Sequence, residues 1–294
     1  MKIAICFNGL PRLIKQCHLD VFNYFIKNNN VDIYAHFWWD DEYKNKTNRL
    51  HVNEKFEETP MEDFKRLYKP KKIIYEKCPD REVDLTSING WNKEKCEDEE
   101  ETTTKIFGYF TEYGFYSKHL SMKKSLDLID NIKDYDLIII CRSDMLKFRK
   151  RTFMVEIKKL NFKNKIYFPS TLEGGTKFAG EFSNRLGDWF FFSTPENIKK
   201  FVEESYNLID KRVRIPVHNQ ERYDFLIKKS NLGWAIFNSS VSVRRFIIEE
   251  WENPDYRKNN FITPEFYTEL FDKENKTFKE DEKLPCYTKN IIIK

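Results

Sequence analysis

The chain has 294 residues, enough for one large α/β domain or two small ones with a substantial buried core. Its 51 basic and 47 acidic residues give a formal net charge of only +4, so no domain-wide basic field points to nucleic acid as a partner. Aromatic residues make up 16% of the chain, which excludes a disordered protein.

In the first half of the chain, predicted strands alternate with predicted helices. Residues 2–7 are apolar almost without interruption, which is typical of a strand covered on both faces in a parallel sheet. Residues 79–105 contain a run of charged residues, and we interpret them as a surface loop in a place that allows a substrate lid. The other predicted elements are strands over residues 31–38, 71–75 and 135–140, and helices over residues 13–25, 61–68 and 115–132.

In the second half, two capping patterns fit the start of one helix. Ser193 with Glu196 forms a possible capping box, and Thr194 with Pro195 at the first helical position is the alternative. The predicted elements here are strands over residues 165–168, 188–192 and 233–237, one helix from about residue 195, and another over residues 219–230.

This order of elements predicts an α/β protein with an open, mostly parallel central sheet flanked by helices. In such sheets, ligands bind beyond the carboxyl ends of the strands. The strand ends with polar residues are at residues 8–9, 38–41 and 142–144, and we expect them to meet at one edge.

The cysteines and the apolar runs indicate the cellular compartment of the protein. No two of the 6 cysteines have C-x-x-C spacing, and Cys6 and Cys141 lie in apolar runs, so we expect free thiols in a reducing compartment. The opening stretch, MKIAICFNGLPR, reaches Gly and Pro too early for a signal peptide. No stretch approaches the roughly 20 apolar residues of a transmembrane helix. We therefore expect a soluble, cytoplasmic protein.

The stretch from Asn8 to Arg12 follows the first predicted strand. Gly9 would let the backbone pass close to a ligand, and the guanidinium of Arg12 suits phosphate oxygens. The stretch is neither a G-x-G-x-x-G fingerprint nor a P-loop. Taken alone, it fits an ordinary strand-to-helix turn with a surface arginine better than a phosphate site.

Asp144 follows the strand over residues 135–140, beside Arg142 and Ser143. A single carboxylate in this place is able to hold Mg²⁺ or Mn²⁺, whose remaining ligands are phosphate and water. An aspartate that satisfies backbone donors in a turn is the alternative. These residues alone leave both interpretations open.

Two further carboxylates are candidates for acid–base chemistry. Asp188 follows a glycine-rich stretch where a substrate would have access, and Glu221 lies at the start of a predicted helix. A carboxylate in a first helical turn also matches the helix dipole, so Glu221 has a purely structural alternative. His36, Trp38 and Trp39 lie in or next to a predicted strand; we expect His36 to be structural, and the tryptophans either pack in the core or stack on a base or sugar.

Five stretches now occur together in one order: KIAICFNGLPR, VDIYAHFWW, YDLIIICRSDM, GDWFFFSTPENIKKF and NQERYDFLIKKSNLGW. Together they resemble a family of GT-A-type glycosyltransferase-like proteins found in large DNA viruses and in bacterial polysaccharide loci. The resemblance implies a single GT-A-like, Rossmann-like domain over about residues 1–245, with a donor-binding half over about 1–150 and an acceptor half over about 151–245. Residues 246–294 would form a C-terminal extension.

The resemblance also implies ligands and roles. The donor would be a nucleotide-sugar, UDP- or GDP-linked, the acceptor a glycan, and the cofactor Mn²⁺ or Mg²⁺. Asp144 would be the metal-binding last carboxylate of an Asp-x-Asp motif, although Arg142 stands in the first position. Asp188, and after it Glu221, would serve as the base. The donor-binding residues would be Asn8, Gly9, Arg12, Arg142 and Ser143.

Two other functions remain open on the sequence. A nucleotidyltransferase for sugar phosphates shares the diphosphate geometry, but usually has a glycine-rich basic loop after its first strand. A non-catalytic nucleotide-sugar or glycan-binding module is the second, and the loss of the first aspartate of the motif favours it.

Overall fold

The structure is a computed structural model of the chain, and it describes residues 1–41, 43, 58–78, 116–147, 152–158, 160–169, 189–210, 219–237 and 241–243. The predicted loop over residues 79–105 and the predicted extension over residues 246–294 lie outside the described residues. None of the described helices is long and apolar enough to cross a bilayer.

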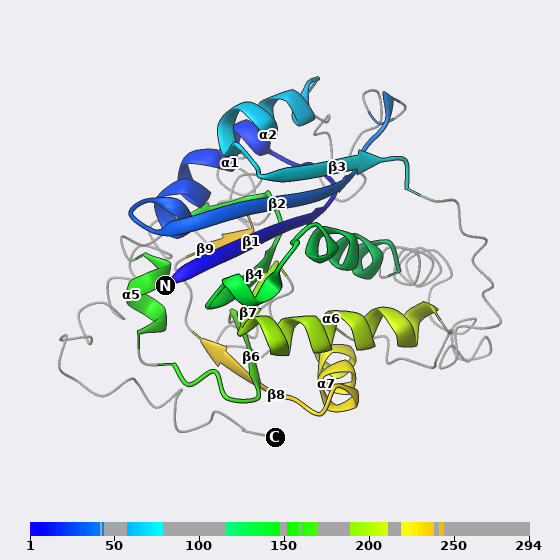
Figure 1. Cartoon of the computed structure of the whole chain (residues 1–294). Helices are drawn as coiled ribbons and strands as arrows, with labels where there is room; N and C mark the ends of the chain where they lie inside the picture. The colour runs from blue at the N-terminus through cyan, green and yellow to red at the C-terminus, as the bar shows by residue number, and fades with distance from the viewer. Residues whose placement is uncertain are drawn as a thin grey trace, which may run out of the picture.

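A seven-stranded sheet in the order β3-β2-β1-β4-β7-β6-β8 forms the centre of the described structure (Figure 1). β1 pairs in parallel with both β2 and β4, and β2 with β3, while β7 is antiparallel to its neighbours β4 and β6. β6 and β8 are again parallel. The strands are β1 (Lys2–Gly9), β2 (Asn30–Trp38), β3 (Lys72–Glu76), β4 (Leu137–Cys141), β6 (Lys165–Pro169), β7 (Phe190–Ser193) and β8 (Gly233–Phe237). The predicted α/β fold with an open, mostly parallel sheet is confirmed.

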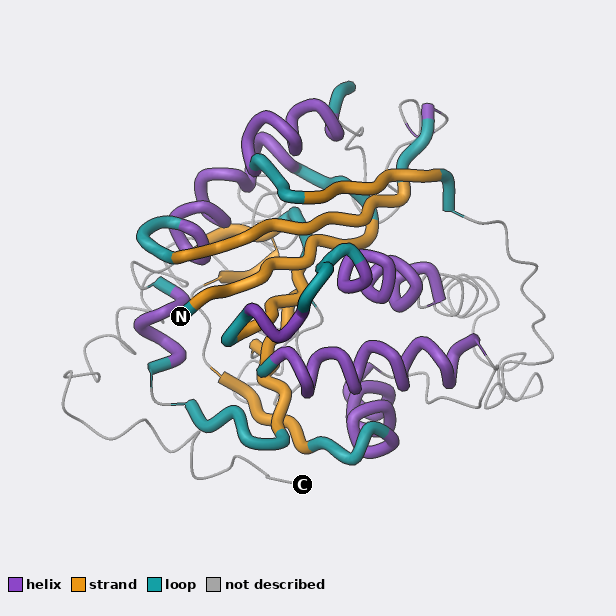
Figure 2. The backbone as a smooth tube through the Cα atoms, in the orientation of Figure 1, coloured by secondary structure: helices purple, strands orange, loops and turns teal. Residues whose placement is uncertain are grey.

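Helices cover both faces of the sheet (Figure 2). Ile3, Ile5 and Phe7 of β1 belong to a core shared with α1, α2 and α5, whereas Ala4 and Cys6 belong to a core shared with residues 116–127, α6 and α7. Alternate residues of a strand point to opposite faces, so a strand covered on both sides is apolar at every position. The helical segments are α1 (Ile14–Val21), the π-helical turn η1 (Phe22–Ile26), α2 (Pro60–Tyr68), residues 116–127, the 3-10 turn η3 (Ile132–Asp134), α5 (Phe153–Ile157), α6 (Pro195–Asp210) and α7 (Asn219–Lys229).

Two details of the predicted helices are decided by the structure. The helix expected over residues 115–132 ends at residue 127, and η3 follows, with the Asn131 side chain accepting a hydrogen bond from the backbone of Lys133. At the start of α6, Thr194 is the capping residue, because its Oγ1 accepts from the Asn197 amide at 3.4 Å. Ser193 belongs to β7 instead, and its hydroxyl donates to the Lys165 carbonyl.

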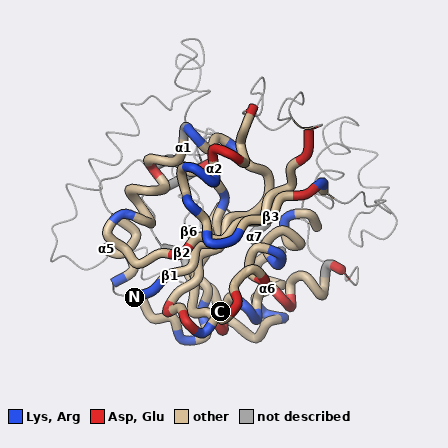
Figure 3. The backbone as a smooth tube through the Cα atoms, turned by 45° about the horizontal axis from the view of Figure 1, so that its top comes forward, with Lys and Arg blue, Asp and Glu red and all other residues tan. Residues whose placement is uncertain are grey.

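A second sheet, of two strands, begins directly after Asp144. β5 (Met145–Lys147) pairs antiparallel with β9 (Val241–Val243), so the segment after Asp144 lies beside the segment that follows β8. Basic and acidic positions are interspersed over the described elements (Figure 3).

The chain reverses its direction of travel across the sheet at β1. From β1 it proceeds to β2 and β3 on one side, and it later returns to place β4 on the other side. The helix after β1, α1, packs on one face, and the helical segment before β4 packs on the opposite face. Adjacent parallel strands with this property form a topological switch point, where open α/β sheets bind ligands at the carboxyl ends.

Candidate functional site

The carboxyl ends of β1, β2 and β4 meet at one edge of the sheet, as predicted. In the strand register, Gly9 lies opposite Phe37 and Phe7 opposite Cys141. The buried side chain of Asn8 crosses from β1 to β4, where its Nδ2 donates to the Cys141 carbonyl at 3.1 Å. This amide therefore fixes the two strand ends that border the switch point.

Gly9 ends β1 in a conformation that favours glycine. Its φ is +91°, and a Cβ built on it would meet no atom of the described chain within 4 Å. Its amide donates to the Ser121 hydroxyl at 2.8 Å. The backbone here is thus held from one side and has open space where a side chain would project, which suits the close approach of a ligand.

The loops after β1 and β4 are joined through Ser143. Its buried hydroxyl accepts from the Arg12 amide at 3.1 Å and donates to the Arg12 carbonyl at 2.9 Å. Both backbone groups of Arg12 are therefore tied to the residue that stands between Arg142 and Asp144. Two arginines are thus brought to the same edge of the sheet.

Arg142 and Asp144 form an ion pair with two contacts. Arg142 Nε donates to Asp144 Oδ1 at 2.8 Å, and Nη2 contacts Oδ2. The Asp144 side chain is 1% exposed and that of Arg142 24% exposed, so the carboxylate lies behind the guanidinium. The Arg142 amide also donates to the Trp189 carbonyl at 2.9 Å, which ties β4 to the start of β7.

The ion pair of Arg142 and Asp144 decides whether Asp144 is available to the expected metal ion. Mg²⁺ and Mn²⁺ bind through carboxylate oxygens, and both oxygens of Asp144 contact the Arg142 guanidinium. Within the described ranges, no group of three or more His, Cys, Asp or Glu side chains is placed to hold a metal ion. In this arrangement Asp144 does not fit the role of a metal ligand.

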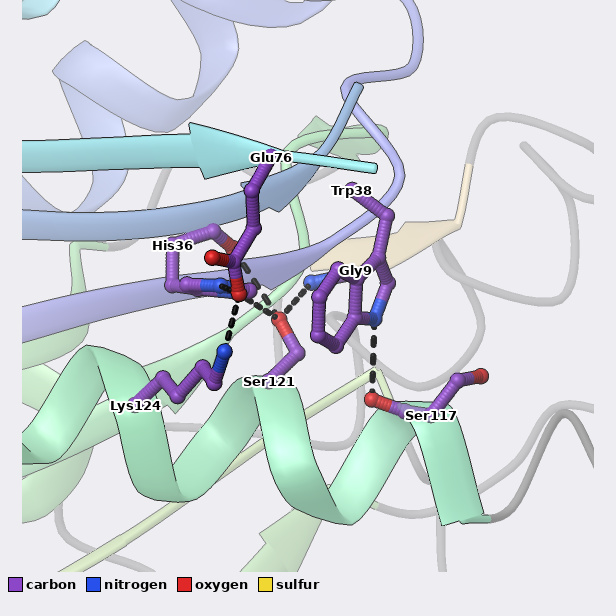
Figure 4. Close-up of polar contacts among 7 residues, drawn as sticks. All are labelled: Gly9, His36, Trp38, Glu76, Ser117, Ser121 and Lys124. Carbon is purple, nitrogen blue, oxygen red and sulfur yellow. Dashed lines mark hydrogen bonds and ion pairs between the residues drawn. The ribbon is translucent and has the colours of Figure 1, made fainter. Parts of the chain in front are cut away.

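A partly buried polar network contacts the Gly9 amide through Ser121 (Figure 4). The Ser121 hydroxyl, on the helix over residues 116–127, contacts His36 Nδ1 at 2.8 Å as well as the Gly9 amide. His36 Nε2 lies 3.2 Å from Glu76 Oε1, and Lys124 contacts the same oxygen. The network therefore runs from the end of β1 through β2 to the end of β3.

In the neutral form of His36 with its proton on Nε2, the ring donates to Glu76, and its Nδ1 contacts the Ser121 hydroxyl. The same hydroxyl accepts from the Gly9 amide and donates to the His36 carbonyl at 3.0 Å. Burial lowers the pKa of His36 despite the opposing effect of Glu76, which favours the neutral form. The hydrogen bond from Lys124 is the main cause that keeps the pKa of Glu76 below its usual value.

His36 was expected to be structural, and Ser121 was not among the predicted site residues. The signal that could have revealed their contact is a polar residue at a position expected to be buried. His36 interrupts an apolar strand, and Ser121 lies beside Met122, the first residue of the buried stripe of its helix. Buried polar side chains need partners, so two of them on neighbouring elements indicate a contact.

The remaining candidates lie partly outside the described residues. Asp188 is not described, but Trp189, the next residue, lies at the site edge through its contact with Arg142. The buried Nε1 of Trp189 has no hydrogen-bond partner in the described part of the chain. Glu221 belongs to the first turn of α7, and its side chain is not described. Both Trp38 and Trp39 are buried, and Trp38 Nε1 donates to the Ser117 carbonyl at 2.9 Å, so core packing describes them.

No protein-family model matches the sequence, and no curated protein matches it. Among solved structures, the apo form of the glycosyltransferase GlyE from Streptococcus pneumoniae TIGR4 matches with 8% identity and a TM-score of 0.38, over 78% of this chain and 44% of that chain. A second GlyE structure matches with 9% identity and a TM-score of 0.35, over 80% and 44% of the two chains. A glycosyltransferase involved in the glycosylation of the major capsid of PBCV-1 matches with 6% identity and a TM-score of 0.40, over 81% of this chain and 83% of that chain. This chain thus spans less than half of GlyE, and the likeness to these glycosyltransferases concerns the fold alone.

Proposed function

We propose that this protein is a glycosyltransferase that moves a sugar from a nucleotide-sugar, UDP- or GDP-linked, to a hydroxyl of a glycan. One observation carries the proposal: the ends of β1 and β4 meet at the topological switch point and bring Gly9, Arg12 and Arg142 to one edge. That edge is the general ligand position of open α/β sheets. The sequence resemblance described above supplies the reaction class, in surface polysaccharide or viral glycan synthesis.

Sugar transfer from a nucleotide-sugar requires positive charge beside the leaving nucleoside diphosphate. Departure of the nucleoside diphosphate builds negative charge on its phosphate oxygens, and guanidinium groups stabilise that charge through two-point hydrogen bonds. The Ser143 hydroxyl holds the backbone of Arg12, and Asp144 holds the guanidinium of Arg142, which supports this role for the two arginines. A Cβ at Gly9 would meet no described atom within 4 Å, which supports a close approach of the diphosphate to the backbone there.

The acceptor hydroxyl needs a base if the enzyme inverts the configuration of the sugar. We propose Asp188 for this role and Glu221 as the second choice. Asp188 directly precedes Trp189, whose carbonyl contacts Arg142, so the chain passes the proposed donor site at this point. Glu221 lies at the beginning of α7, the helix that leads into β8.

Thermal shift with UDP-, GDP- and CMP-sugars tests the binding step. We expect at least one nucleotide-sugar to raise the melting temperature, because a ligand that binds only the folded state stabilises it. Stabilisation by none of them would reject the proposal. Asp188→Asn should keep the shift and lose sugar transfer, whereas the matched control Glu203→Gln, an exposed carboxylate on α6, should keep both.

The two alternative functions give different outcomes in the same assays. A sugar-phosphate nucleotidyltransferase would release pyrophosphate from a nucleoside triphosphate and a sugar phosphate, which a pyrophosphate assay detects. A non-catalytic binding module would show the thermal shift without transfer or hydrolysis of any donor. The arginine at position 142, in place of a carboxylate, is the observation that favours such a module.

A further inference from the structure

We infer that the guanidinium of Arg142, held in place by Asp144, takes the position of a divalent cation at the donor diphosphate, so that nucleotide binding does not require metal. The inference rests on the proposed function and names the group that would contact the diphosphate. It concerns the same edge of the sheet and Asp144, the residue expected to bind the metal.

Both carboxylate oxygens of Asp144 already contact a cation, the guanidinium of Arg142. Its Oδ1 accepts from Arg142 Nε at 2.8 Å, and its Oδ2 contacts Nη2 of the same guanidinium. A Mg²⁺ or Mn²⁺ ion on this carboxylate would compete with both charge-assisted contacts. The carboxylate is also only 1% exposed, so a hydrated ion has little access to its oxygens in this arrangement.

The ion pair of Arg142 and Asp144 exposes its positive member to solvent. Asp144 lies behind and Arg142, at 24% exposure, lies in front, so the cationic member is the one that reaches solvent. A guanidinium carries five N–H groups in one plane, and Nε and Nη2 of Arg142 contact Asp144. The group is therefore oriented by its carboxylate and suited to two-point contact with a phosphate.

The backbone also holds this arginine at the switch point. The Arg142 amide donates to the carbonyl of Trp189, directly before β7, and the next residue, Ser143, binds both backbone groups of Arg12. The arginine at position 142 thus extends from a fixed point between β4 and β7, next to a second arginine. A positive charge fixed before the ligand arrives stabilises an anion without reorganisation, as a bound cation would.

The test compares nucleotide binding with and without metal on the unmodified chain. We expect UDP or GDP, and the corresponding sugars, to give the same rise in melting temperature and the same Kd in EDTA as in Mn²⁺. Stabilisation that appears only with Mn²⁺ would overturn this inference and leave the proposed function standing. Absence of stabilisation under both conditions would overturn the proposed function, and this inference with it.

Variants locate the effect at Arg142. Arg142→Gln should weaken nucleotide binding in EDTA by about ten- to a hundredfold, the range for loss of hydrogen bonds to a charged group. The matched control is Arg66→Gln, because Arg66 on α2 also contacts a buried aspartate, Asp63, at 2.6 Å. Unchanged nucleotide affinity in Arg142→Gln would overturn the inference.

A direct metal probe keeps the inference falsifiable if Arg142→Gln does not fold. Titration of Mn²⁺ alone, followed by its electron paramagnetic resonance signal, should show no site that Asp144→Asn removes. A site in the unmodified chain that disappears in Asp144→Asn would assign the carboxylate to a metal and overturn the inference.

Discussion

Removal of the Ser121 hydroxyl should destabilise the protein more than its small size suggests. In Ser121→Ala, the Gly9 amide loses its acceptor at 2.8 Å, and His36 Nδ1 loses its partner at 2.8 Å, both in a buried place. An unsatisfied buried donor or acceptor costs about 1–3 kcal/mol, and alanine returns about 0.5 kcal/mol of helix propensity. We expect a loss of about 2–4 kcal/mol in the free energy of unfolding, or roughly 5–15 °C in melting temperature.

Ser125→Ala is the matched control on the same helix. Ser125 is equally buried, but among the described residues its hydroxyl has a single partner, the Met122 carbonyl of the same helix, to which it donates at 2.8 Å. We expect this variant to lie within about 1 kcal/mol of the unmodified chain, because it loses one local hydrogen bond. Urea unfolding followed by tryptophan fluorescence measures both. Equal destabilisation by the two substitutions would refute the assignment of Ser121 as the group that holds Gly9.

Three further outcomes follow from single positions. Gly9→Ala should lower the free energy of unfolding by about 1–2 kcal/mol in urea titrations, because φ is +91° although space is open; an unchanged midpoint would contradict this. The hydrogen bond from Lys15 is the main cause that lowers the pKa of Asp63 to about 2, so its stabilisation is complete above its ordinary value of 3.8 and is lost as pH falls through about 2. The difference in unfolding free energy between the unmodified chain and Asp63→Asn, about 1–2 kcal/mol at neutral pH, should therefore shrink from pH 4 to pH 2, and a constant difference would oppose it. Burial raises the pKa of Cys6 and Cys141, so iodoacetamide should modify them, as read by mass spectrometry, only after denaturation; rapid labelling of the native chain would oppose their burial.

Most of the sheet could be predicted because its strands are buried on both faces. The apolar runs in β1, β2 and β4 and the spacing in the flanking helices carried enough signal, and β8 has the predicted bounds of residues 233–237. β5 and β9 were missed because strands of three residues are too short to show an alternation, and α5 was missed because five residues make less than two helical turns. The antiparallel direction of β7 had no local signal either, since direction depends on partners far away in the chain.

The positions of the candidate site residues could be predicted where they depend on the strand order alone. Parallel strands end at a common edge, so the meeting of Asn8, Gly9 and Asp144 near the switch point followed from the strand order. The contact between Arg142 and Asp144 could also have been predicted, because the two residues carry opposite charges and are only two apart, in the connection between β4 and β5. The support from Ser121 could not, since it depends on how the helix over residues 116–127 lies against β1 and β2.

The reversed direction of β7 brings two further chain positions to the edge where β1 and β4 end. β6 ends at Pro169 on this edge, and β7 begins at Phe190 on the same edge, because it runs back against β4. If β7 were parallel to β4, its first residue would lie at the opposite edge, and the Trp189 carbonyl could not accept from the Arg142 amide. The start of an antiparallel strand thus contributes to this edge beside the ends of the parallel strands.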